Sequence, residues 1–180
     1  TGQFLHEWSS IYDSKSGERG IFSREAAQKV AAKNGRRKFD DIEFGTNPCS
    51  EIILRPYQFC NLSEVIVRSD DTVDTLLEKI EIATILGTFQ STLTYFPYLR
   101  KIWQKNTEEE RLLGVSLTGI YDCKLTNDVN DVTLPSRLEL LKNKAIEVNK
   151  KIANELGINQ SVAITCVKPS GTVSQLTNSA

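Results

Sequence analysis

The sequence contains no methionine, a single histidine and only four cysteines among its 180 residues. The cysteines at positions 49, 60, 123 and 166 include no Cys-x-x-Cys pair, and structural zinc sites usually need such local pairs. We therefore predict no metal site. Two structural disulfides remain arithmetically possible. Cys123 and Cys166 have no cluster of polar residues around them in the sequence, so we expect both cysteines to behave as small buried hydrophobic residues.

Strong net charge and long apolar runs are also missing. The formal net charge is -1, which leaves no electrostatic footprint for nucleic acid or for an anionic membrane. No apolar run approaches membrane-spanning length, and no signal-peptide pattern opens the chain. These absences predict a cytoplasmic protein without nucleic-acid or membrane partners. Thiols in that compartment stay reduced unless they are catalytic.

The chain opens at Thr1 without an initiating methionine and stops at Ala180 directly after a loop-like stretch. This favours an internal portion of a longer polypeptide, with residues 1–180 as a single partial domain. A threonine also remains downstream of an excised intein, and an engineered or split-gene boundary explains the same start equally well. The length suffices for one sizeable core.

Helical and extended patterns alternate along the chain. Periodicity and capping residues predict helices over residues 1–13, 23–31, 72–86, 107–114 and 135–156, and strands over 62–67, 115–120 and 161–167. This alternation predicts an α/β fold with parallel strand pairing.

Two of the predicted helices carry more specific expectations. The helix that begins after Thr72 is apolar on most faces past Ile80, so we expect it to be largely buried. Thr107 and Glu110 match a capping box, which predicts a short helix that ends at Gly114.

Residues 45–62 concentrate the reactive side chains of the sequence. Pro48 favours an extended conformation at Asn47, and residues two apart in an extended chain point the same way. Asn47, Cys49 and Glu51 would then place an amide, a thiol and a carboxylate on one face. This arrangement is typical of a functional site, and a surface turn with a buried structural cysteine explains the same residues equally well.

The order Asn-Pro-Cys-Ser-Glu-Ile at 47–52, with Cys60 eleven residues after Cys49, resembles the finger loop of ribonucleotide reductase catalytic subunits. Gly-Glu-Arg-Gly-Ile-Phe at 17–22 and Lys-Pro-Ser-Gly-Thr-Val-Ser at 168–174 are similar to the same family. The proline and the short cysteine spacing most resemble the adenosylcobalamin-dependent class, in particular its monomeric ribonucleoside-triphosphate reductases. The resemblance extends over essentially the whole chain.

The resemblance implies a fold and a set of partners. The chain would be the central part of a ten-stranded α/β barrel, like those of ribonucleotide reductases and glycyl-radical enzymes, with residues 45–62 as a central finger loop. The substrate would be a ribonucleoside triphosphate or diphosphate, and the reductant thioredoxin or a similar dithiol. The remaining segments of the same reductase, including its effector site, would lie outside this chain.

The resemblance also implies individual roles. Cys49 would become the thiyl radical that takes the 3′-hydrogen, Glu51 would be the base on the 3′-hydroxyl, and Asn47 would bind the substrate. Cys60 would be one half of the dithiol that supplies electrons and ends as a disulfide. The family's partner for Cys60 lies upstream and is missing from this chain.

A predicted strand leads into the motif at 168–174, whose N–H groups and hydroxyls can hold an anion. Our candidates for the substrate phosphates are Pro169, Ser170, Gly171, Thr172 and Ser174. Strand–turn sequences of this composition are common, so the assignment depends on the position of the motif after the finger loop.

The radical-generating cofactor is implied by the resemblance alone. Adenosylcobalamin carries radical generation in this class, but no residue here must ligate cobalt, and His6 is not a convincing ligand. Two alternatives stay open. One is a reductase with another radical source, such as a diiron partner subunit, and the other is a catalytically silent nucleotide-binding barrel fragment.

Overall fold

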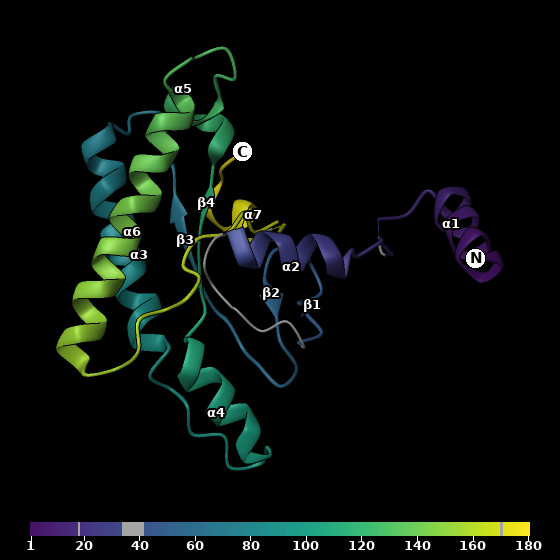
Figure 1. The fold of residues 1–180 in the computed structure, drawn as a ribbon. Coiled ribbons are helices and arrows are strands. Elements are labelled where there is room, and N and C mark those ends of the chain that lie inside the picture. The colour runs from purple at the N-terminus through teal and green to yellow at the C-terminus, as the bar shows by residue number, and fades with distance from the viewer. Residues whose placement is uncertain (18, 34–41, 170) are drawn as a thin grey trace.

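The computed structural model describes residues 1–17, 19–33, 42–169 and 171–180. Figure 1 shows the arrangement of its elements. In chain order they are α1 (Gly2–Ser14), α2 (Arg24–Lys33), β1 (Gly45–Thr46), β2 (Ile53–Leu54), β3 (Asn61–Ile66), α3 (Val73–Gln90), α4 (Lys101–Glu110), β4 (Leu113–Thr118), a 3₁₀ turn (Ile120–Asp122), α5 (Lys124–Asn127), α6 (Leu134–Leu156) and α7 (Val173–Thr177).

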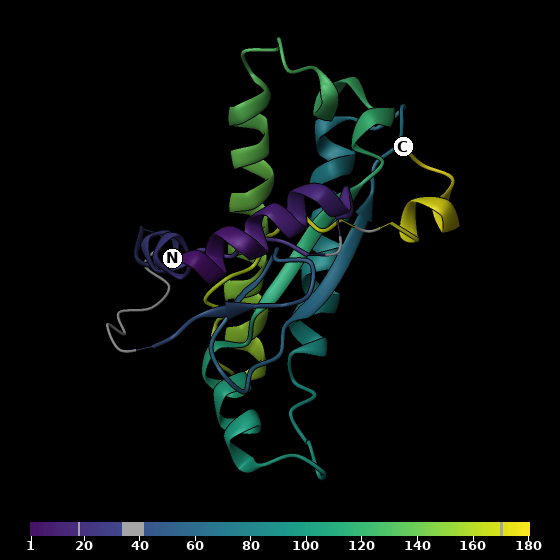
Figure 2. The same cartoon turned by 90° about the vertical axis from the view of Figure 1, so that its right-hand side faces the viewer.

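The centre of the fold is a parallel pair of strands. β3 and β4 run side by side in the same direction, with Asn61 opposite Leu113 (Figure 2). The predicted third strand at 161–167 lies along the other edge of β4, where Thr165 bridges to Val115 without forming an extended ladder. The expected α/β fold with parallel pairing is therefore confirmed for this part of the chain.

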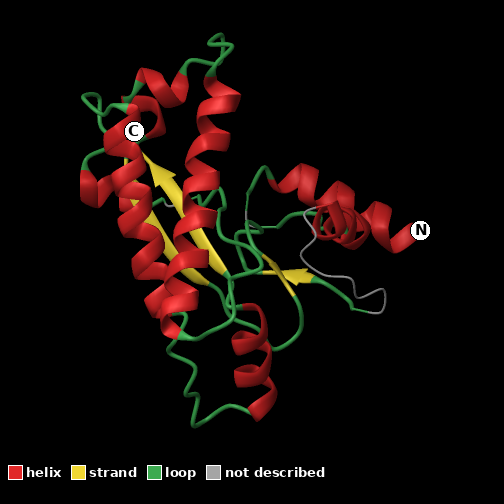
Figure 3. Ribbon diagram, turned by 60° about the vertical axis from the view of Figure 1, so that its left-hand side comes forward, coloured by secondary structure: helices red, strands yellow, loops and turns green. Residues whose placement is uncertain are grey.

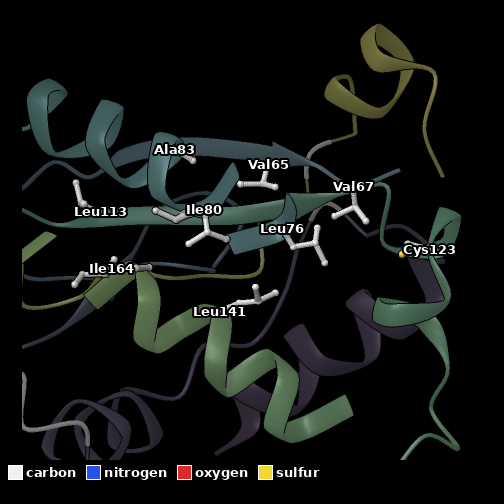
Figure 4. Close-up of a cluster of buried hydrophobic side chains, with 11 residues drawn as sticks. Val65, Val67, Leu76, Ile80, Ala83, Leu113, Cys123, Leu141 and Ile164 are labelled. Atoms are coloured by element: carbon white, nitrogen blue, oxygen red, sulfur yellow. The ribbon is translucent and has the colours of Figure 1, made fainter. Parts of the chain in front are cut away.

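Two long helices cover one face of this pair. α3 and α6 lie together on the side of β3 and β4 that is opposite to β1 and β2 (Figure 3). Alternate strand residues point to this face, where they form the main apolar core (Figure 4). The core consists of Val65, Val67, Leu76, Ile80, Ala83, Leu113, Val115, Cys123, Leu141, Ala145 and Ile164.

Local sequence signals set the ends of both helices. Thr72 and Thr75 form a reciprocal capping box at the start of α3. Pro135 occupies the first turn of α6, and Gly157 ends that helix with a φ of 65°, a conformation that glycine adopts without strain. The predicted positions of these two helices are confirmed.

Two expectations about the helices were wrong. α3 is not buried on all sides, because Ile82 and Leu86 on its outer face are 59% and 61% exposed. Thr107 lies in the last turn of α4 and does not cap a new helix, while Gly114 lies within β4. Tertiary contacts override the local capping pattern here. The Glu110 carboxylate is buried and accepts a hydrogen bond from the Gln58 side-chain amide.

A short hairpin of β1 and β2 lies on the other side of the parallel strands (Figure 1). α2 packs against its base through Ala27, Ala31 and Phe44. α1 stands apart from these elements and buries none of its residues. Among the described residues, no helix is long and apolar enough to cross a membrane.

Candidate active site

The finger segment, residues 45–62, begins as a tight hairpin. The Asn47 N–H donates to the Ile52 carbonyl at 3.3 Å, and the Ile52 N–H donates to the Asn47 side-chain oxygen at 3.1 Å. Ser50 closes the turn with a φ of 64° and donates its N–H to the Asn47 carbonyl. The amide of Asn47 therefore fixes the loop that carries Cys49.

This turn corrects the expectation of an extended segment. Residues 48–50 are in a turn, so simple alternation does not place Asn47, Cys49 and Glu51 on one face. The turn instead exposes the Cys49 thiol at the tip and directs the Glu51 side chain inward, where it is 3% exposed. A thiol accessible to a ligand thus lies two residues from a buried carboxylate.

Lys168 supplies the counter-charge for that carboxylate. Its Nζ lies 3.0 Å from Glu51 Oε1, and its own side chain is 20% exposed. Burial alone would raise the pKa of Glu51. The Lys168 ammonium, the Glu51 backbone N–H and the Asn47 amide together outweigh burial and hold that pKa below its usual value. Glu51 is therefore a carboxylate at neutral pH.

Burial and the charge of the Glu51 carboxylate also change the pKa of two neighbouring thiols, Cys60 and Cys166. Burial, followed by the negative charge of Glu51, raises the pKa of Cys60. Burial and the charges of Glu51 and Glu64 raise the pKa of Cys166 to about 12. Both side chains are therefore thiols, not thiolates, at neutral pH. The expectation that Cys166 has no polar groups around it was wrong, whereas Cys123 is buried in the apolar core as predicted.

Gly114 lets the hairpin approach the parallel strands. A Cβ built at this position would lie 2.5 Å from Leu62 Cδ2, 3.0 Å from Cys166 Sγ and 3.2 Å from Ile52 Cδ1. Because Gly114 has no side chain, there is room for side chains from β3, from the hairpin and from residues 163–166, which lie along β4 and are called the edge segment below. The face of β4 that turns away from the helical core is the face that carries the site.

A buried polar network holds the chain between Cys49 and Cys60. The Arg55 guanidinium donates to the Asn106 carbonyl at 3.2 Å and pairs with the Glu109 carboxylate. Asn106 in turn donates its side-chain amide to the Pro56 carbonyl at 2.9 Å. These contacts anchor the finger segment to α4, so the spacing of the two cysteines is set by a fixed backbone.

The predicted phosphate motif begins at this site. Lys168 donates its backbone N–H to Ser116 Oγ at 3.0 Å, which fixes the start of the motif beside β4. Gly171 and Thr172 are exposed, and α7 begins directly after them at Val173. Ser170 lies outside the described residues. The roles of Pro169, Ser170, Gly171, Thr172 and Ser174 stay predictions.

Sequence reasoning missed Lys168 and Cys166 as members of the site. Neither lies near the finger segment in the chain, and only the pairing of the edge segment with β4 brings them to it. The lysine that opens the 168–174 motif was the available signal. Among the described residues, no group of three His, Cys, Asp or Glu side chains could hold a metal ion.

No protein-family model matches the chain. Among curated proteins, the adenosylcobalamin-dependent ribonucleoside-triphosphate reductase of Lactobacillus acidophilus is 32% identical over 161 residues, which cover 76% of this chain and 21% of that protein. The enzyme of the same name from Lactobacillus gasseri is 29% identical and covers 89% of this chain and 25% of its own length. The chain thus spans about a fifth to a quarter of these relatives.

Solved structures give the same result. The crystal structure of a B12-dependent (class II) ribonucleotide reductase matches with a TM-score of 0.62 and 26% identity, over 78% of this chain and 22% of that chain. The motifs at 47–52 and 168–174 predict the same family. The chain is a homologue of one stretch of the adenosylcobalamin-dependent ribonucleoside-triphosphate reductases.

Proposed function

We propose that this chain forms part of the catalytic barrel of an adenosylcobalamin-dependent ribonucleotide reductase. The reductase would convert ribonucleoside triphosphates or diphosphates to 2′-deoxyribonucleotides for DNA synthesis. The observation that carries this proposal is the hairpin turn, which exposes Cys49 beside a buried, ionised Glu51. The homology to reductases of that name supports it independently.

The residues of the site divide the reaction among them. A thiyl radical at Cys49 takes the hydrogen atom from the 3′-carbon, and Glu51 accepts the proton of the 3′-hydroxyl. The 2′-hydroxyl leaves as water with a proton from a thiol. A dithiol that includes Cys60 gives that proton and the new hydrogen at the 2′-carbon, supplies two electrons and ends as a disulfide. Glu51 returns its proton to the 3′-oxygen, and Cys49 returns its hydrogen atom to the 3′-carbon. Asn47 hydrogen-bonds the substrate.

The protonation states in the site suit this sequence of steps. A base must be ionised before it accepts a proton, and Glu51, paired with Lys168 despite its burial, is ionised at neutral pH. The group that protonates the departing hydroxyl must still carry its proton, and the raised pKa of Cys60 provides that. Burial is the first cause of the raised Cys60 pKa, and the negative charge of Glu51 adds to it by disfavouring the Cys60 thiolate.

The complete fold would be a ten-stranded α/β barrel with the finger segment at its centre. β3, β4 and the edge segment at 163–166 would be neighbouring strands of that barrel. Their outer face packs against α3 and α6, and their inner face meets the hairpin at Gly114. The strands are thus covered on both faces, as is usual for parallel strands of α/β folds, and this supports the proposal.

Adenosylcobalamin would supply the radical that is passed to Cys49. The exposed position of Cys49 at the tip of the turn fits a radical source that approaches from outside this chain. We further propose thioredoxin or a similar dithiol as reductant, effector control by other segments of the reductase, and a cytoplasmic location, where the site thiols stay reduced.

The test uses a full-length reductase reassembled from this chain and the remaining segments, called the reassembled reductase below. With substrate, dithiol, effector and adenosylcobalamin, we expect cobalt–carbon bond cleavage and deoxynucleotide formation, both lost in Cys49→Ser. Cys123→Ala, a change of a cysteine in the apolar core, is the matched control and should keep both. Formation of deoxynucleotide without cobalt–carbon bond cleavage would favour another radical source. Absence of both cleavage and deoxynucleotide would favour a catalytically silent nucleotide-binding barrel.

A further inference from the structure

Lys168 opens the 168–174 motif and pairs with Glu51, but no step of the reaction proposed above has been assigned to it. Two contacts hold it in place: its backbone N–H donates to Ser116 Oγ, and its ammonium lies 3.0 Å from Glu51 Oε1. Ser116 is itself buried in β4. The ion pair therefore joins the finger segment to the strand edge, and both partners are largely removed from water.

A carboxylate in such a place depends on its counter-charge. Burial favours the neutral acid, and an opposite charge within a few ångström favours the ionised form. The other titratable groups around the Glu51–Lys168 pair are the thiols of Cys49, Cys60 and Cys166 and, beside Cys166, the Glu64 carboxylate, none of which offers a positive charge. Among the described residues, Lys168 is the cation that holds the pKa of Glu51 down.

We propose that Lys168 is a positioning residue of the reductase, which keeps the Glu51 base ionised and holds its carboxylate in place. This inference rests on the proposed role of Glu51 as the base for the 3′-hydroxyl. The Lys168 ammonium also contacts the Cys49 thiol, and the role proposed here is the one that acts through Glu51. Its place at the head of the phosphate motif ties the base to the segment that would bind the substrate phosphates.

The direct test follows the Glu51 carboxyl by ¹³C NMR during a pH titration of the chain. Lys168→Met removes the cation, so the pKa of Glu51 should rise by about 1–3 units. Lys168→Arg keeps the charge and should leave the pKa close to that of the unchanged chain. Lys168→Gln is a second neutral variant in case Lys168→Met fails to fold.

Lys144→Met is the matched control. Lys144 also pairs with a glutamate, Glu81, at 2.6 Å, but this pair joins α6 to α3 on the outer side of the fold. Its removal should leave the Glu51 titration unchanged. An unchanged Glu51 pKa in the neutral Lys168 variants, with the fold intact by circular dichroism, would overturn the inference.

Activity of the reassembled reductase separates this inference from the proposed function. A higher Glu51 pKa leaves less ionised base at low pH, so the acid limb of kcat should move to higher pH in Lys168→Met by the same shift, with little change in KM. Lys168→Arg should restore the original profile. If the Glu51 pKa measured by NMR rises and the acid limb of kcat does not move, Glu51 is not the base and its proposed role fails. The effect of Lys168 on the Glu51 pKa would still be confirmed.

Discussion

Replacement of Gly114 by alanine tests the close approach of the finger segment to the strands. The added Cβ would lie 2.5 Å from Leu62 Cδ2 and 3.0 Å from Cys166 Sγ, both closer than carbon normally approaches these atoms. The neighbours must shift, and overpacking of this kind costs about 1–3 kcal/mol of unfolding free energy. Because Ile52 Cδ1 lies at 3.2 Å, the shift should also reach the hairpin and reduce reductase activity.

Gly87→Ala provides the opposite case. A Cβ at Gly87, within α3, meets Leu113 and Ser63 at 3.6 Å, which is ordinary van der Waals contact. Alanine is favoured over glycine inside a helix by about 1 kcal/mol, so this change should be neutral or stabilising. Urea unfolding of both variants, followed by far-UV circular dichroism, measures the two free energies. The packing argument is refuted if Gly114→Ala is as stable as the unchanged chain, or if Gly87→Ala is the more damaging change.

Three further predictions concern the site and its support. Glu51→Gln keeps the size of the side chain and removes the base, so turnover of the reassembled reductase should fall about 10²–10⁴-fold with little change in nucleotide affinity; near-normal turnover would make Glu51 structural. The chain by itself should form no deoxynucleotide with cofactor, dithiol and substrate, because it spans only about a fifth to a quarter of its relatives; sustained turnover would contradict this. The Lys79 ammonium lies 2.6 Å from the buried Asp71 carboxylate and, despite burial, holds the pKa of Asp71 below its usual value. A depressed carboxyl pKa stabilises the fold above the ordinary value of about 4 and loses that effect as the pH falls, so the stability deficit of Asp71→Asn, measured by urea unfolding, should shrink on acidification.

The sequence predicted those parts of the fold that depend on local signals. Thr72 caps α3 and Gly157 ends α6 because both signals act within one turn of the helix. Thr107 and Glu110 form an equally good local pattern, yet they end a helix instead of starting one. The difference is tertiary, since Glu110 is buried against Gln58 from a distant part of the chain.

The site was only partly predictable for the same reason. The motif around Cys49 indicated which residues are reactive, but the turn at Ser50 was missed, and with it the contrast between an exposed thiol and a buried carboxylate. Lys168 reaches Glu51 only because the edge segment pairs with β4. A contact between residues so far apart in sequence leaves no local pattern, so neither periodicity nor composition could have found it.

The central claim is that two cysteines of one short segment do different jobs. Loss of isotope from 3′-labelled substrate, measured beside release of free base, tests it most directly in the reassembled reductase. Cys49→Ser should abolish cofactor-dependent 3′-hydrogen exchange, because the O–H bond is too strong for an oxygen radical to form there readily. Cys60→Ser should keep that exchange, block clean deoxynucleotide formation and release free base. Deoxynucleotide from Cys49→Ser, or equal loss of 3′-chemistry in both folded variants, would contradict the account.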